Sequence, residues 1–200
     1  KQMRRRQAIL RAVATVYILG VALAGCSGPG PYSPSPKPPA AHPVLTFGLS
    51  AIDIVDETAG ATTDPGLIGS FSVPPQQAIR RWAAERLQVT GGEPGILRFR
   101  ITAAGAVRTP LEKTPGVSGW FTRDQEELVT VVFAAHLEAR RNDGGLIAAA
   151  TSRAEASRSF VEKIKPPDRR AGLDALIATA LASFDRELEA RVRAEMPDLL

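Results

Sequence analysis

Apolar and polar positions alternate in four segments of the chain, which predicts four β-strands with one buried and one solvent-facing side. These segments are residues 44–56, 96–108, 128–138 and 146–160. In the first segment the apolar positions change parity midway, which predicts a β-bulge near Ser50 and Ala51. In the second, the inward positions continue to Ala103 and Val107. The fourth segment has a face of small residues, which favours a helix lying close against it.

Apolar residues at helical spacing predict a first helix between the first two strands. We expect Ser72 to cap its start, two prolines to occupy its first turn, and Gly91 with Gly92 to end it. Trp82 falls on the apolar stripe, so it is predicted to be a core residue. Three arginines are expected to face outward or to border that stripe: Arg80, Arg81 and Arg86.

A second helix is predicted near the end of the chain, starting at Pro167 or Asp168 and closed by Pro197. Its apolar stripe should face the sheet, and two pairs of opposite charge four residues apart should lie outside: Glu187 with Arg191 and Glu189 with Arg193. The stripe consists of Leu173, Leu176, Ile177, Ala180, Leu181, Phe184, Leu188 and Val192.

Turn-forming residues separate these elements and define the fold class. Residues 57–69, rich in Thr, Gly, Asp and Pro, predict a loop, and residues 142–145 (Asn-Asp-Gly-Gly) predict a hairpin turn. The resulting order is β-α-β-β-β-α. We therefore expect a single α+β domain over residues 44–200, with a mainly antiparallel four-stranded sheet and two helices on one face.

The positive charge of the chain is concentrated at its beginning. The formal net charge is +4, but five of the 25 basic residues and none of the 21 acidic residues precede Cys26. These basic residues are followed by an apolar stretch over residues 12–24, the length of a signal-peptide core and short for a transmembrane helix. Residues 1–25 are predicted to be a signal peptide, and since the remainder is nearly neutral, no nucleic-acid partner is expected.

The only cysteine, Cys26, follows directly on Leu23, Ala24 and Gly25. This quartet resembles the lipobox of bacterial lipoproteins, in which small residues before the cysteine admit a membrane-embedded peptidase and the sulfur carries a diacylglycerol. The resemblance implies that Cys26 is the lipidated first residue of the mature protein, and that its partner is a membrane. A chance cysteine beside a membrane helix is the alternative.

Seven prolines among Gly, Ser and Ala make residues 26–43 a tether. Extended polyproline at ~3.1 Å per residue would hold the domain up to roughly 50 Å from the bilayer. An alternative is that the tether is a ligand for an aromatic groove. In enteric bacteria, lipoproteins retained in the inner membrane tend to have Asp directly after the cysteine. This chain has Ser27 at that position, so we expect it on the periplasmic side of the outer membrane.

One segment of the predicted domain, residues 109–127, has no periodic pattern. It is longer than hairpin loops need to be and carries Trp120 and Phe121 between Gly119 and Thr122. These aromatic residues are candidates for contact with a partner or with lipid, and the alternative is that they fold back over the sheet. Replacing both aromatic residues by Ser distinguishes these alternatives. The melting temperature should fall strongly only if the aromatic residues fold back over the sheet.

Motifs for catalysis, cofactors and metals are absent from the sequence. It has no glycine-rich phosphate loop, no Gly-x-Ser-x-Gly elbow and no His-Glu-x-x-His pair, and one cysteine with two histidines cannot assemble a zinc cluster. The remaining candidates are an Asp53–Asp56 carboxylate pair and His136, which is expected to be an exposed strand residue. An enzyme would require a deep pocket lined by these residues.

The lipobox, the tether, the Val73-Pro74-Pro75 helix start, the segment over residues 106–114 (AVRTPLEKT) and the small-residue last strand together resemble uncharacterised lipoproteins of alphaproteobacteria. The element order is also similar to the small lipoprotein of lipopolysaccharide assembly and to auxiliary lipoproteins of lipid-transporting ABC systems. These resemblances imply a non-catalytic accessory factor of envelope assembly or transport, which binds a membrane-protein partner or lipid through the sheet edge or the Trp120 loop. The alternatives are a periplasmic enzyme or small-ligand binder, or a structural tether.

Overall fold

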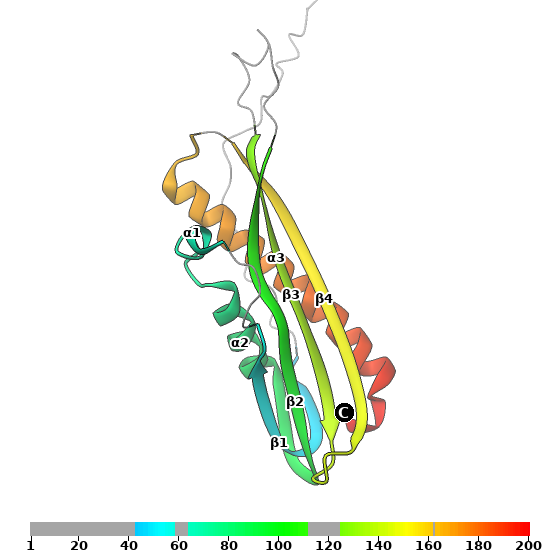
Figure 1. Cartoon of the computed structure of the whole chain (residues 1–200). Helices are drawn as coiled ribbons and strands as arrows, with labels where there is room; N and C mark the ends of the chain where they lie inside the picture. Colours follow the sequence, from blue (N-terminus) through cyan, green and yellow to red (C-terminus); the bar gives the residue numbers. More distant parts are fainter. Residues whose placement is uncertain (1–42, 59–63, 112–124, 162) are drawn as a thin grey trace, which may run out of the picture. The chain divides into compact units, whose positions relative to one another are not determined.

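The fold is α+β, with a four-stranded sheet in the order β1-β2-β3-β4 and its main helices on one face (Figure 1). The computed structural model describes residues 43–58, 64–111, 125–161 and 163–200. The strands are β1 Leu45–Asp56, β2 Leu87–Pro110, β3 Gln125–Arg140 and β4 Leu146–Val161. The helices are α1 Pro65–Ile68, α2 Pro75–Arg86 and α3 Pro166–Glu195, followed by a 3₁₀ turn at Pro197–Leu199.

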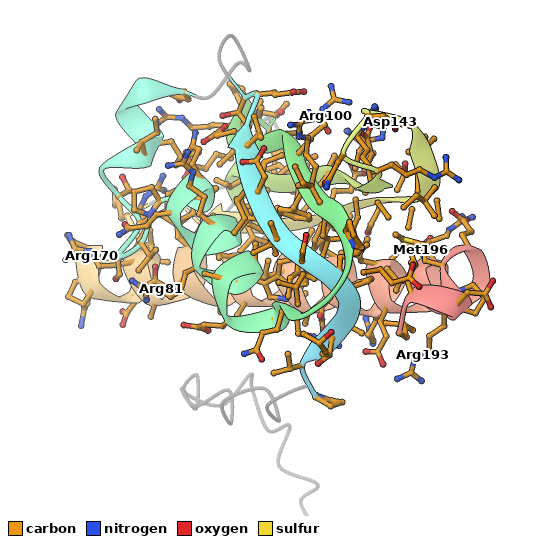
Figure 2. All side chains as sticks on the ribbon, turned by 90° about the horizontal axis from the view of Figure 1, so that it is seen from below. Arg81, Arg100, Asp143, Arg170, Arg193 and Met196 are labelled. Carbon is orange, nitrogen blue, oxygen red and sulfur yellow. The ribbon has the colours of Figure 1, made fainter. Side chains whose placement is uncertain are left out.

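The sheet is mixed, as one parallel and two antiparallel pairings build it. β1 pairs in parallel with β2, from Leu45 opposite Leu87 to Asp56 opposite Ile101, because α1 and α2 carry the chain back to the starting edge. β2, β3 and β4 follow one another antiparallel. α2 and α3 pack against the core of the sheet. Figure 2 shows Arg100 on the side of the sheet away from α3. The predicted fold class is confirmed.

α2 ends earlier than the sequence predicts. Its last residue is Arg86, and β2 begins at Leu87, so Gly91 and Gly92 lie within the strand and do not end the helix. The strand extends back to Leu87 because these residues pair with the start of β1. Gly92 has a different role: a Cβ there would meet the Gly48 carbonyl oxygen at 2.8 Å, so a side chain would separate the two strands.

The predicted cap of α2 is also wrong. Pro74 occupies the N-cap position and makes no side-chain hydrogen bond to the helix. Ser72 instead binds α3, because its Oγ donates to Asp174 Oδ2 at 2.5 Å and its backbone N–H donates to Oδ1 at 2.9 Å. The polar side chain expected to start one helix therefore connects it to another.

Two strands contain irregularities that change which side chains are buried. The bulge predicted in β1 is confirmed, because its register with β2 shifts on both sides of Leu49. A second shift, between Ile101 and Ala103 of β2, was not predicted. Beyond it the inward positions are Ala104 and Ala106, while Val107 is 44% exposed, so the inward placement of Ala103 and Val107 is wrong.

The second half of the domain follows its sequence pattern closely. β3 buries the predicted alternate residues, and the hairpin turn to β4 has Gly144 at φ 88°, a conformation that favours glycine. α3 begins at Pro166, within two residues of the expected start, and its apolar stripe packs on β4 and β3. Within the predicted loop 57–69 lies the one-turn helix α1, whose N-cap Asp64 accepts a hydrogen bond from the Gly66 backbone N–H.

An aromatic cluster joins both helices to the sheet. The ring centroid of Trp82 lies 5.7 Å from that of Phe99 and 5.1 Å from that of Phe184, with edge-on geometry to the latter. Trp82 therefore packs against the core as predicted, although part of its surface stays open between the helices. This open part of the Trp82 side chain lines the candidate site described below.

Candidate functional site: a groove between the two long helices

A groove with a volume of about 510 Å³ lies between α2 and α3. Its wall on α2 includes Ala78 and Trp82, and its wall on α3 includes Ile177, Ala178 and Leu181. Small ligands typically occupy pockets of ~300–1,000 Å³ that are mostly apolar with a few placed polar groups. The volume and lining of this groove fit that description.

The polar groups bordering the groove are largely engaged within the protein. Asp174 accepts both hydrogen bonds of Ser72, and Asp185 Oδ1 accepts the indole N–H of Trp82 at 3.2 Å. Arg81 and Glu85 also line the groove, one helical turn apart on α2 and with opposite charge. The border holds one basic and three acidic side chains, so it offers no matched site for an anion, and most of the remaining lining is apolar.

A buried ion pair connects the two helices next to the groove. Arg86 is 4% exposed and Asp185 is 2% exposed, and Arg86 Nε donates to Asp185 Oδ1 at 2.8 Å. Arg86 Nη2 also donates to Glu189 Oε2 at 2.6 Å. The outward or bordering placement of Arg86 is thus wrong, whereas Arg80 and Arg81 are exposed as predicted. Glu189, expected on the outside, lies half-buried between Arg86 and Arg193.

The sequence contains a signal for this pair. Arg86 falls on the buried stripe of α2, three residues after Ala83 and seven after Ile79. Asp185 similarly lies between Leu181 and Leu188 on α3. A basic and an acidic residue on the apolar stripes of two helices that cover the same sheet predict a buried pair.

The carboxylates considered for catalysis do not form a pair. Asp53 accepts a hydrogen bond from Arg98 Nε at 3.1 Å, whereas Asp56 binds Thr58 and lies 3.3 Å from Arg80. Partial burial opposes ionisation of Asp56, but the hydrogen bonds of Thr58 and the charge of Arg80 hold its pKa below the ordinary value. Each carboxylate is therefore matched to its own cation.

His136 is half-buried on the polar face of the sheet, where its Nδ1 lies 3.0 Å from Thr151 Oγ1. Neither His136, Asp53 nor Asp56 lines the groove. Within the described residues, no group of three or more His, Cys, Asp and Glu side chains could hold a metal ion.

Arginine–carboxylate pairs lie beside His136 on that polar face. Arg100 donates to both carboxylate oxygens of Glu57 at 2.9 and 2.8 Å and to Glu138 at 3.1 Å, and Arg140 donates to Glu138 at 2.7 Å. Burial opposes ionisation of Glu138, but the hydrogen bonds from Arg140 and Arg100 outweigh it, so its pKa is lowered. The network connects β2 to β3 and to the end of β1, and we assign it a structural role.

The residues predicted to contact a membrane lie outside the described residues. These are Cys26 with its lipobox Leu23, Ala24 and Gly25, the tether, and the Trp120–Phe121 pair. Among the helices of the described segments, none combines the length and apolarity needed to span a bilayer. Lipid attachment at Cys26 and partner contact at Trp120 both stay predictions.

Comparisons with known proteins reveal similarity only in structure. No protein-family model matches the chain, and no curated protein matches it significantly in sequence. The structure of rare lipoprotein B from Shewanella oneidensis is similar with a TM-score of 0.38 at 9% identity, over 72% of this chain and 95% of that one. A minor lipoprotein from Acinetobacter baumannii is similar with a TM-score of 0.37 at 12% identity, over 78% of this chain and 96% of that one. Both names contain the word lipoprotein, but scores this low assign neither a family nor a function.

Proposed function

We propose that this chain is a lipid-anchored accessory lipoprotein of the bacterial envelope, which binds the acyl chain of a lipid in the groove between α2 and α3. In this proposal it is not an enzyme. The single observation that carries the ligand class is the groove itself, with its volume of about 510 Å³ and its apolar wall around Trp82. The anchor rests on the sequence, in which Cys26 follows the Leu-Ala-Gly lipobox.

An acyl chain fits the chemistry of the groove better than a charged ligand. Two carboxylates at its border, Asp174 and Asp185, already accept hydrogen bonds from Ser72, Trp82 and Arg86. A polar ligand would compete with these bonds and lose its own hydration, whereas an apolar chain gains from leaving water by roughly 0.8 kcal/mol per buried methylene. In this proposal the protein lies on the periplasmic side of a membrane, and Ser27 favours the outer membrane. Anchored there through the tether, the domain would have lipid within reach.

Quenching of Trp82 fluorescence by a brominated fatty acid tests the ligand. The chain has two tryptophans, so Trp120→Phe leaves Trp82 as the only one, and bromine quenches tryptophan at close range. In that background we expect saturable quenching by dibromostearate. Ala178→Phe, which fills the groove from α3, should weaken the binding several-fold.

The matched control is Thr179→Phe, one residue further along α3 and exposed, which should leave the quenching unchanged. Quenching that is equally strong with Ala178→Phe, or absent at concentrations below the micelle threshold, would contradict lipid binding in the groove. Circular dichroism on each variant shows whether the fold is kept.

The anchor has a separate test. Cys26→Ala should prevent acylation, leaving the precursor uncleaved or the protein mislocated, as measured by radiolabelled palmitate incorporation and membrane fractionation. An acylated, membrane-bound Cys26→Ala protein would refute the anchor while leaving the groove proposal standing.

A further inference from the structure

β4 is an open edge of the sheet with features that suit it to pairing with another strand. Among the described strands it pairs with β3 alone. Its sequence contains no Pro and no Gly, and its register with β3 runs without a shift from Ala148 to Phe160. β1, the other edge, is interrupted by two register shifts. Natural edges usually carry bulges, prolines or shortness as protection. β4 is 16 residues long without a proline, and its register shifts lie only near its ends, at Ile147 and next to Val161.

The solvent-facing side of β4 carries one basic and one acidic residue at its middle. Arg153 and Glu155 are both exposed and point to the same face, because they are two positions apart. Neither takes part in a salt bridge among those found within the described segments. The opposite side of the strand holds small residues, among them Ala150, Ser152 and Ala154.

We propose that β4 pairs antiparallel with β4 of a second copy of this chain, around a two-fold axis at Ala154. In an antiparallel pair, residues directly opposite one another point to the same face, so the axis must pass through a residue and not between two. An axis at Ala154 places Arg153 opposite Glu155 of the second copy, and Glu155 opposite its Arg153. The two sheets then form one continuous sheet.

Charge favours the register centred on Ala154 over the registers centred on Arg153 and Glu155. Moving the axis by one residue to Arg153 would place that arginine opposite its own copy, and moving it to Glu155 would place two carboxylates opposite each other. Like charges directly opposite destabilise a strand pair, whereas opposite charges stabilise it. The strand is thus complementary to itself in one register among these three.

The flank of α3 on the side of this edge is compatible with the pairing. Ile177 and Leu181 line the groove on the side of α3 that faces α2. Residues about half a helical turn away from them therefore lie on the opposite flank of α3. That flank carries Ala175, Thr179 and Ser183, four residues apart. Because the two-fold axis brings both α3 helices to the same face of the joined sheet, small side chains there allow the close axial distances of ~8–10 Å seen between packed helices.

Disulfide trapping in membranes that contain the intact protein tests the register. Residues directly opposite in an antiparallel pair have Cα atoms ~4.5–5.5 Å apart, within the range that a disulfide spans. We expect Ala154→Cys to form a disulfide-linked dimer on a non-reducing gel, well above the background of the wild type, whose only cysteine is Cys26. Ser159→Cys is the control, because the register separates its two copies by ten residues, or roughly 33 Å, and it should give no dimer.

Charge exchange tests the same register without a covalent bond. Arg153→Glu should lower the Ala154→Cys crosslinked fraction several-fold, and adding Glu155→Arg should restore it, because the exchanged pair is again complementary across the axis. Arg141→Glu, the same change of charge at an exposed site in the hairpin turn, should have no effect. Absence of the Ala154→Cys dimer, an equal dimer with Ser159→Cys, or failure of the double exchange to restore crosslinking would each overturn the proposal.

Discussion

Replacing Arg86 by Met should destabilise the domain by about 3–5 kcal/mol, the range found when one partner of a buried ion pair is removed. The side chains of Arg86 and Asp185 are 5% and 3% exposed, and their contact is a hydrogen bond of 2.8 Å. After the substitution Asp185 keeps the hydrogen bond from Trp82, which carries no charge. Glu189 loses Arg86 but keeps the salt bridge to Arg193, so the energetic cost arises mainly at Asp185.

Equilibrium unfolding in urea, followed by circular dichroism, measures this loss. For a domain of this size, 3–5 kcal/mol corresponds to a fall in melting temperature of roughly 6–20 °C. The matched control is Arg80→Met on the same helix, whose salt bridge to Asp56 joins side chains that are 55% and 21% exposed. Such a surface pair contributes about 0–1 kcal/mol, so the control should unfold close to the wild type.

The double variant Arg86→Met/Asp185→Leu separates the charge from the packing. If the cost of Arg86→Met comes from the buried Asp185 carboxylate having lost Arg86, removing that carboxylate as well should recover most of the stability. A loss below about 1 kcal/mol for Arg86→Met, or an additive double variant, would refute a buried ion pair between α2 and α3.

Two further predictions concern the packing of α3 and the polar face of the sheet. Gly172→Ala should cost about 1–3 kcal/mol in urea unfolding, because the added Cβ would meet Phe160 Cε1 at 2.8 Å, whereas Gly69→Ala, with nothing within 4 Å, should be nearly neutral; equal stability of both would contradict the close approach of α3 to β4. The pKa of Glu138 is lowered in the folded state from its ordinary value of 4.5. Its ionised form therefore stabilises the fold fully above pH 4.5, and this contribution is lost as the pH falls through the folded-state pKa. The stability difference between wild type and Glu138→Gln should therefore stay constant well above pH 4.5 and shrink as the pH falls below that value, and a difference independent of pH would show that the ion network around Glu138 is not formed.

Elements whose pattern reflects one buried face were predicted well from the sequence. β3 and the stripe of α3 follow their expected positions, because a half-buried strand and an amphipathic helix each impose a regular spacing on their own residues. The hairpin turn before β4 was equally local, since Gly144 adopts the conformation that its sequence favours.

Errors arose where a distant segment decided the local structure. Gly91 and Gly92 resemble a helix stop, yet pairing with β1 draws them into a strand, and the close approach of Gly48 explains why Gly is present at residue 92. The shift after Ile101 exchanged the buried and exposed sides of β2, which alternation alone could not reveal because Ala is small enough for either side. Tertiary contacts overruled local preference in both cases.

The candidate site was the part least accessible to sequence reasoning. The groove exists because α2 and α3 lie side by side on the same face, and no motif records that distance. The residues first considered for chemistry, Asp53, Asp56 and His136, have structural partners on the other face of the sheet or at its edge. The sequence correctly predicted Trp82 as a core residue. That Trp82 also lines the groove could not be predicted, because the sequence does not show the gap between α2 and α3.

The parallel pairing of β1 with β2 has a consequence for the order of folding. β3 and β4 are neighbours in sequence and can pair through a five-residue connection, whereas Leu45 pairs with Leu87 across 41 intervening residues that include α1 and α2. Closing the longer loop costs more entropy before any contact rewards it, which slows formation of that edge. During synthesis β1 emerges before α1, α2 and β2, so its apolar residues Leu45, Phe47 and Leu49 have no strand to pair with until the crossover is complete.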